Sequence, residues 1–171
     1  RLDAAKHPLS TPSGKIEIFS TTIEGFGYAD CPGHAVWLEP FERLGGAGND
    51  KFPLHLISPQ PKRRLHSQYD QSAYSQAGKI QGREPLTLHP SAAAKQNIQA
   101  GDLLRVFNDR GACIVGAVIS ENIKEDVVIL PTGAWFAPSA NMAGLEMNGN
   151  PNVLTKDTVS YTHLTLPTNR E

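Results

Sequence analysis

Cysteine is scarce in this chain. Its two cysteines, Cys31 and Cys113, stand far apart, with no CxxC spacing and no histidine at metal-ligand intervals. The sequence therefore gives no support for a zinc site or a framework of disulfides. The cysteines do not indicate the cellular compartment of the protein, because two reduced thiols and one long-range disulfide give the same sequence pattern.

Long apolar runs and net charge are lacking too. No apolar run approaches the roughly 20 residues that a membrane-spanning helix needs, so no membrane span is expected. The formal net charge of -1 gives no general attraction to nucleic acid or to an anionic membrane. The chain begins at Arg1 rather than at Met, and we expect it to be a piece of a longer protein.

Familiar catalytic motifs are also absent. The sequence has no G-x-G-x-x-G, P-loop, H-E-x-x-H or G-x-S-x-G motif, and no cysteines paired as in iron–sulfur proteins. His7 and His34 lack acidic or cysteine neighbours arranged for catalysis, and His89 is expected to pack at a strand end. No acid–base pair can be nominated, so we predict no catalytic residue and no metal ligand within this chain.

Glycine and proline are plentiful, 15 and 13 residues, so long helices are not expected. Residues 1–50 are predicted to form an extended arm and linker belonging to a preceding domain. Within them, residues 14–20 alternate apolar and polar side chains, which predicts a short strand. The glycine-rich residues 45–50 give the best linker.

Residues 51–158 carry the signals of a compact domain. Residues 108–111, Asn-Asp-Arg-Gly, predict a hairpin turn, and residues 90–97 predict a short helix with Pro90 in its first turn. Short strands and tight turns favour a mainly β fold, a closed β-barrel with one or two short helices, over a parallel α/β sheet. The expected strands cover residues 52–57, 84–89, 103–107, 113–120 and 127–130.

Positive charge is concentrated in residues 51–68, which hold four basic residues and no Asp or Glu. Arg64, His66, Ser67 and Gln68 offer donors suited to phosphate oxygens and to the edges of a heterocycle. A solvated basic loop explains the charge equally well, and both interpretations stay open at this point. Nucleic-acid binding is not expected, because the basic stretch is short and few aromatic side chains follow it.

Two later segments offer weaker signals. Asn150 and Asn152 flank Pro151, and their amides could read a ring edge, although an ordinary turn explains this composition better when it is taken alone. Residues 132–136, Thr-Gly-Ala-Trp-Phe, could pack on a ligand, but such aromatic residues more often belong to a core or an interface.

Read in order, several blocks of the sequence resemble the C-terminal portion of molybdopterin enzymes of the dimethyl-sulfoxide-reductase family. The resemblance extends over about residues 8–158 with comparable spacing, and it is strongest to the branch that reduces biotin sulfoxide, trimethylamine N-oxide or dimethyl sulfoxide. The blocks are PLSTPSGKIEIFS (8–20), DCPGHAVWLEP (30–40), PLHLISPQPKRRLHSQ (53–68), REPLTLHPSAAA with GDLLRVFNDRG (83–111) and GNPNVLT (149–155).

The resemblance implies a double-psi-type β-barrel that covers a bis(molybdopterin guanine dinucleotide) molybdenum centre. It further implies oxygen-atom transfer from a small S-oxide or N-oxide, an electron donor protein, and upstream domains of the same enzyme that supply a serine ligand to the metal. The matching positions that would face the cofactor are Ser58, Gln60, Arg64, His66, Ser67 and Gln68 in the first loop and Asn150 and Asn152 in the second.

The end of the chain departs from the family, which continues after residue 155 with a Gly-Thr-Ser turn and a glutamine near the pterin. Here residues 159–171 include SYTHLTLPTNRE, which resembles a translated sequencing adapter, and we expect this tail to be non-native. A stand-alone β-barrel module that binds a nucleotide or another protein remains the alternative. The sequence leaves the compartment open between cytoplasm and periplasm.

Overall fold

The computed structural model describes residues 3, 5–40, 42–46 and 49–156. The chain forms two compact units, Arg1–Phe41 and Glu42–Glu171, and each is described by itself. The predicted domain limits (1–50, 51–158 and the tail 159–171) stay predictions, and the tail lies outside the described residues. Within the described ranges, no helix is long and apolar enough to cross a membrane.

The described part of the first unit contains one short helix, α1 (Thr21–Glu24). It begins where the Ser20 side chain accepts a hydrogen bond from the Ile23 amide (3.3 Å). The strand predicted over residues 14–20 is wrong. Ile16 and Ile18 are 83% and 87% exposed there. An alternating pattern forms a strand only where a neighbouring strand pairs with it, and the described part of this unit contains none.

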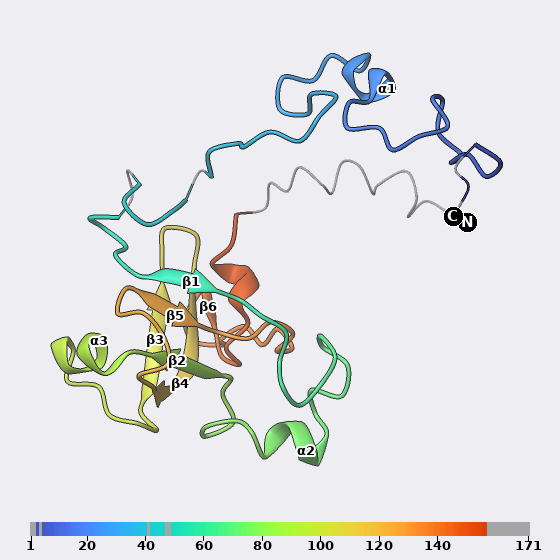
Figure 1. Cartoon of the computed structure of the whole chain (residues 1–171). Coiled ribbons are helices and arrows are strands. Elements are labelled where there is room, and N and C mark those ends of the chain that lie inside the picture. Colours follow the sequence, from blue (N-terminus) through green and yellow to red (C-terminus); the bar gives the residue numbers. More distant parts are fainter. Residues whose placement is uncertain (1–2, 4, 41, 47–48, 157–171) are drawn as a thin grey trace. The chain divides into compact units, whose positions relative to one another are not determined.

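The described part of the second unit is built on one curled sheet of six strands (Figure 1). The strand order is β1-β5-β2-β4-β3, with β6 added to β4, so the path ends at β1 and β3 and forms a half-barrel. A mainly β fold with a few short helices is therefore confirmed. The strands are β1 (His55–Ile57), β2 (Pro85–Leu88), β3 (Leu103–Phe107), β4 (Ala112–Ile119), β5 (Val127–Ile129) and β6 (Leu145–Glu146).

The predicted hairpin is confirmed. Strands β3 and β4 pair antiparallel from Leu103 opposite Gly116 to Phe107 opposite Ala112. The Asn108 side-chain oxygen accepts hydrogen bonds from the backbone amides of Arg110 (2.9 Å) and Gly111 (3.3 Å), which closes the turn.

Among the described residues, the sheet is accompanied by three short helical segments: α2 (Ala73–Gln76), α3 (Pro90–Lys95) and the 3₁₀ helix η1 (Pro151–Val153). The predicted helix corresponds to α3, with Pro90 at its start. His89, expected to pack at a strand end, caps this helix, because its Nδ1 accepts a hydrogen bond from the Ser91 amide (3.1 Å).

The remaining pairings place two chain segments side by side. β1 pairs with β5 in parallel, and β2 pairs with β4 and β4 with β6 in parallel, while β2 and β5 are antiparallel. Because β1 and β5 are parallel, the segments that follow them leave the sheet at the same edge. Two further backbone hydrogen bonds continue the pairing, from Leu130 to Ile57 (3.0 Å) and from Thr132 to Pro59 (2.9 Å).

The core lies between these strands and α3. Its side chains are mostly aliphatic, so the scaffold is held by burial of apolar area rather than by cross-links. The buried cluster comprises Leu86, Leu88, Ala93, Cys113, Val115, Ala117, Val128, Leu130 and Leu154. Burial also raises the pKa of the Cys113 thiol to about 12, with the nearby Glu146 carboxylate as the second cause.

Candidate functional site

The segment that follows β1 turns back on itself at His66. The Gln60 amide nitrogen lies 3.0 Å from both ring nitrogens of His66, and the Gln60 side-chain oxygen accepts the His66 backbone amide at 3.3 Å. His66 has a φ of 50°, a left-handed conformation that a non-glycine residue adopts only when its surroundings hold it. We call His66 and Ser67 the loop wall.

The segment that follows β5 lies against the loop wall. Trp135 donates its indole N–H to the Ser67 carbonyl (2.8 Å) and its backbone N–H to the Asp70 carboxylate (3.1 Å). At Gly133 a Cβ atom would lie 2.1 Å from the His66 carbonyl oxygen, so only glycine permits this approach. We call residues 132–136 the aromatic wall.

A third wall is formed by Asn150 and Asn152 at the start of η1. The Asn150 side-chain oxygen accepts the Asn152 backbone amide (3.0 Å), and its amide nitrogen donates to the Ala134 carbonyl (2.8 Å). Asn150 is buried and Asn152 is exposed. Asn150 therefore joins this wall to the aromatic wall, and the side chain of Asn152 is the one positioned to meet a ligand.

The three walls surround a cavity of about 530 Å³. This volume lies in the range of sites for compact organic ligands, roughly 300–1,000 Å³. The cavity is lined by the loop wall, by residues 132–136, and by Asn150 and Asn152.

The cavity brings together four of the eight predicted site residues: His66, Ser67, Asn150 and Asn152. The other four, Ser58, Gln60, Arg64 and Gln68, do not line it, although Gln60 and Arg64 contact His66. Ser58 and Gln68 are exposed on the same segment. The role of the eight residues in cofactor binding stays a prediction.

The aromatic wall was assigned to a core or an interface on sequence grounds, and its place in the cavity was missed. The signal that could have found it is Gly133, a few residues after β5, because a glycine can mark a place where another backbone approaches closely. Trp135 and Phe136 are both more than half exposed, so their rings are not core residues of the described chain.

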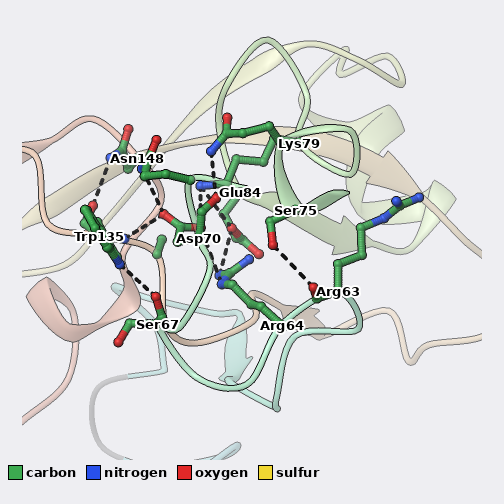
Figure 2. Close-up of polar contacts among 12 residues, drawn as sticks. Arg63, Arg64, Ser67, Asp70, Ser75, Lys79, Glu84, Trp135 and Asn148 are labelled. Atoms are coloured by element: carbon green, nitrogen blue, oxygen red, sulfur yellow. Dashed lines mark hydrogen bonds and ion pairs between the residues drawn. The ribbon is translucent and has the colours of Figure 1, made fainter. Parts of the chain in front are cut away.

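Behind the loop wall lies a buried cluster of four charges, contributed by Arg64, Asp70, Lys79 and Glu84 (Figure 2). Their side chains are between 0% and 3% exposed. Lys79 Nζ lies 2.8 Å from Asp70 Oδ1, and Arg64 Nη2 lies 3.1 Å from Glu84 Oε2. Neither of these two carboxylate oxygens accepts a hydrogen bond of good geometry, so the contacts are chiefly ionic.

The cluster accounts for part of the predicted basic patch. Lys51 pairs with Asp109, and the Arg63 guanidinium lies over the Tyr74 ring at 4.8 Å and donates to the Tyr74 carbonyl (3.1 Å). Arg64 is paired and buried. The positive charge of residues 51–68 is thus mostly engaged within the chain, and it does not form an open surface for anions.

Burial in this cluster raises the pKa of the Glu84 carboxyl above its ordinary value of 4.5, and this effect exceeds the lowering caused by Arg64 and Lys79. The folded chain therefore holds this proton more tightly than the unfolded chain does. The contribution of Glu84 titration to the free energy of unfolding is fully present below pH 4.5 and is lost as pH rises through the folded-state pKa.

We therefore expect the free energy of unfolding of the wild-type chain, minus that of Glu84→Gln, to decrease as pH rises above 4.5 and then to level off. Denaturant unfolding from about pH 4 to about pH 8 measures this difference. Glu125→Gln, the same change at an exposed position, is the control for removing one negative charge. A difference that grows with pH would contradict the raised pKa.

No group of three or more His, Cys, Asp and Glu side chains that could hold a metal ion occurs among residues 3–156 as far as the structure describes them. What the cavity offers is an imidazole ring, a hydroxyl group, a primary amide and two exposed aromatic faces. These groups can bind and orient a ligand that has both polar edges and flat rings.

Comparisons with known proteins identify the family of this chain. Residues 54–169 match the family described as "Molydopterin dinucleotide binding domain". The chain is 49% identical to a biotin sulfoxide reductase from Cereibacter sphaeroides and 47% identical to a trimethylamine-N-oxide reductase from Pasteurella multocida. In each case the match covers 92% of this chain, which spans about a fifth of the length of these relatives (21% and 19%).

Among solved structures, acetylene hydratase from Pelobacter acetylenicus has a similar fold, with a TM-score of 0.70 at 21% sequence identity. The similarity covers 89% of this chain and 21% of that one. The family match spans well over half of the chain, and the two reductases share nearly half of their aligned residues with it. The chain belongs to the family of molybdopterin dinucleotide-binding domains.

Proposed function

We propose that this chain is the cofactor-binding domain of a longer molybdenum oxidoreductase, and that its cavity holds part of a molybdopterin guanine dinucleotide. The observation that carries the proposal is the meeting of two sequence-distant segments, the loop wall and Asn150 with Asn152, at one cavity. These segments resemble the two that face the cofactor in the dimethyl-sulfoxide-reductase family. The family match supports the same ligand class.

The residues present fit such a ligand. His66, Ser67 and Asn152 supply side-chain donors and acceptors for phosphate oxygens or for the edge of a ring system. Because Gly133 has no side chain, the two walls can approach each other closely. Trp135 and Phe136 expose flat rings beside these groups.

The whole enzyme is proposed to reduce a small S-oxide or N-oxide, with two electrons from a donor protein. Two relatives carry the names biotin sulfoxide reductase and trimethylamine-N-oxide reductase, and the chain spans about a fifth of each, which leaves room for the domains that would hold the metal. The bound cofactor supplies the oxygen-atom transfer, and this chain's residues bind and orient it. We propose the bis(molybdopterin guanine dinucleotide) form.

The test uses the complete product of the gene that encodes this chain, purified from cells that make the cofactor. We expect molybdenum in an amount equal to the protein, and guanosine monophosphate, released by acid hydrolysis, in twice that amount. Metal analysis and chromatography of the released nucleotide measure the two. Equal amounts of nucleotide and molybdenum would contradict the bis form, and the absence of both would favour a binding module of another kind.

Two variants test whether the nucleotide is bound in the cavity. Asn152→Ala removes an exposed amide at the cavity, and we expect it to lower the retained nucleotide. Asn122→Ala makes the same change at an exposed position outside the cavity and serves as the control. Equal retention of the nucleotide in the two variants would show that the Asn152 side chain does not bind it.

A further inference from the structure

Arg64 connects two walls of the cavity without lining it. Its Nε donates to the His66 carbonyl (3.0 Å) and its Nη2 donates to the Thr132 carbonyl (3.1 Å). His66 belongs to the loop wall and Thr132 to the aromatic wall. One rigid guanidinium group therefore sets the spacing between them, and the contact from Arg64 to Thr132 joins residues 68 positions apart in the sequence.

The charge of Arg64 is balanced inside the protein. Its Nε lies 3.4 Å from Asp70 Oδ1 and its Nη2 lies 3.1 Å from Glu84 Oε2, and Lys79 contributes the second positive charge of the cluster. Figure 2 shows the four groups close together, to the side of Ser67 and Trp135. With two cations and two carboxylates, the cluster carries no net charge when all four groups are ionised. Such a cluster needs no anionic ligand to complete it.

Asp70 extends the arrangement to the aromatic wall. Its second oxygen accepts the Trp135 backbone amide (3.1 Å), while Trp135 also donates its indole N–H to Ser67 (2.8 Å). The loop wall and the aromatic wall are thus linked by Arg64 on one side and by Asp70 and Trp135 on the other. Burying four charged side chains has a large desolvation cost, which offsets much of their mutual attraction. The cluster therefore contributes more to holding the two walls in fixed positions than to the free energy of unfolding.

We propose that Arg64 is a positioning residue, which fixes the loop wall against the aromatic wall before any ligand binds. This differs from the role that the family resemblance implies, in which Arg64 faces the cofactor. A side chain that is 2% exposed and has its Nε and Nη2 engaged by protein groups is not available to a phosphate. What the cavity holds rests on the proposed function, whereas the positioning role does not.

The first test follows amide hydrogen exchange in the ligand-free 171-residue chain. Arg64→Lys keeps the positive charge but loses the planar fork that reaches both carbonyls. We expect exchange at residues 65–68 and 133–135 to become about tenfold faster, while β3 and β4 keep their protection, because local opening does not require global unfolding. Arg63→Lys, the same change at the exposed neighbouring residue, is the control.

Two results of this experiment would overturn the proposal. Exchange at the two walls that matches the wild type would show that Arg64 does not hold them. An equal acceleration in β3 and β4 would show a general loss of stability rather than positioning. Arg64→Gln, which keeps a planar amide but no charge, provides a second variant if Arg64→Lys fails to fold.

The second test measures retained guanine nucleotide in the complete gene product. We expect Arg64→Lys to lose most of it and Lys62→Ala, at an exposed neighbouring residue, to keep it. Full retention by Arg64→Lys would overturn the positioning role. If the wild-type protein itself holds no guanine nucleotide but the exchange result is as expected, the proposed function fails and the role of Arg64 stands.

Discussion

Gly133→Ala is expected to destabilise the chain by about 3 kcal/mol, through overpacking of two backbones that touch and a left-handed φ. The new Cβ would lie 2.1 Å from the His66 carbonyl oxygen and 2.3 Å from the carbonyl carbon. Both neighbours are backbone atoms, so no side-chain rotation relieves the contact. The loop wall must move away, or the chain must unfold more readily.

Gly101→Ala is a closely matched control. Gly101 has a φ of 91°, against 87° at Gly133, but a Cβ there would meet nothing within 4 Å. We expect this variant to cost only about 1 kcal/mol, the strain of the backbone conformation. Denaturant unfolding compares the two free energies. An equal loss of unfolding free energy in the two variants would contradict the close approach of Gly133 to His66.

A second readout reports movement of the loop wall even if the chain tolerates Gly133→Ala. The chain has two tryptophans, and a Trp37→Phe background leaves Trp135 as the only fluorophore of that type. Because the Trp135 indole donates to Ser67, displacement of the loop wall releases the indole N–H to water. We expect a shift of its emission to longer wavelength in Gly133→Ala and no shift in Gly101→Ala.

Local features of the fold could be predicted from the sequence. The turn at residues 108–111 closes through the Asn108 side chain, and α3 begins at a proline that follows a capping residue. Both depend on neighbours within three residues, so the local sequence is sufficient to determine them. The strand predicted over residues 14–20 does not form, because an alternating pattern contains no information on whether a partner strand exists. Local sequence is therefore insufficient to predict strands.

The parallel pairings could not be predicted in this way. His55 pairs with Val127 across more than 70 residues, and no turn motif encodes such a register. The aromatic wall was missed for this reason, since it reaches the cavity only because β5 lies beside β1. Two segments that line the cavity, the loop wall and Asn150 with Asn152, were predicted together because the family resemblance identified both.

Arg64 shows how a count of charges can mislead. The basic residues of segment 51–68 predict an anion-binding loop or a solvated one, and the structure shows neither for Arg64. Its partners Asp70, Lys79 and Glu84 all lie outside that segment. A window of sequence therefore shows the charge of a segment but not the charges that folding brings against it.

Glu146→Gln is expected to cost about 3 kcal/mol, because a buried carboxylate that accepts several backbone amides cannot be replaced by a group with one acceptor. Glu146 is 1% exposed. Its Oε1 accepts the amides of Ala137 (3.1 Å) and Asn148 (2.8 Å), and its Oε2 accepts the amide of Asn150 (2.7 Å). In the glutamine variant, an NH₂ group faces at least one of these donors.

Glu42→Gln makes the same chemical change at an exposed ion pair, where the Glu42 carboxylate contacts the Arg110 guanidinium at 2.6 Å and 3.0 Å. Exposed pairs contribute roughly 0–1 kcal/mol, so this variant should be close to the wild type. Glu146→Gln should also release Asn150 and with it the third wall. Exchange at the Asn150 and Asn152 amides that accelerates more than exchange in β3 and β4 would show that Glu146 orders the cavity. Equal unfolding free energies for the two variants would contradict that role.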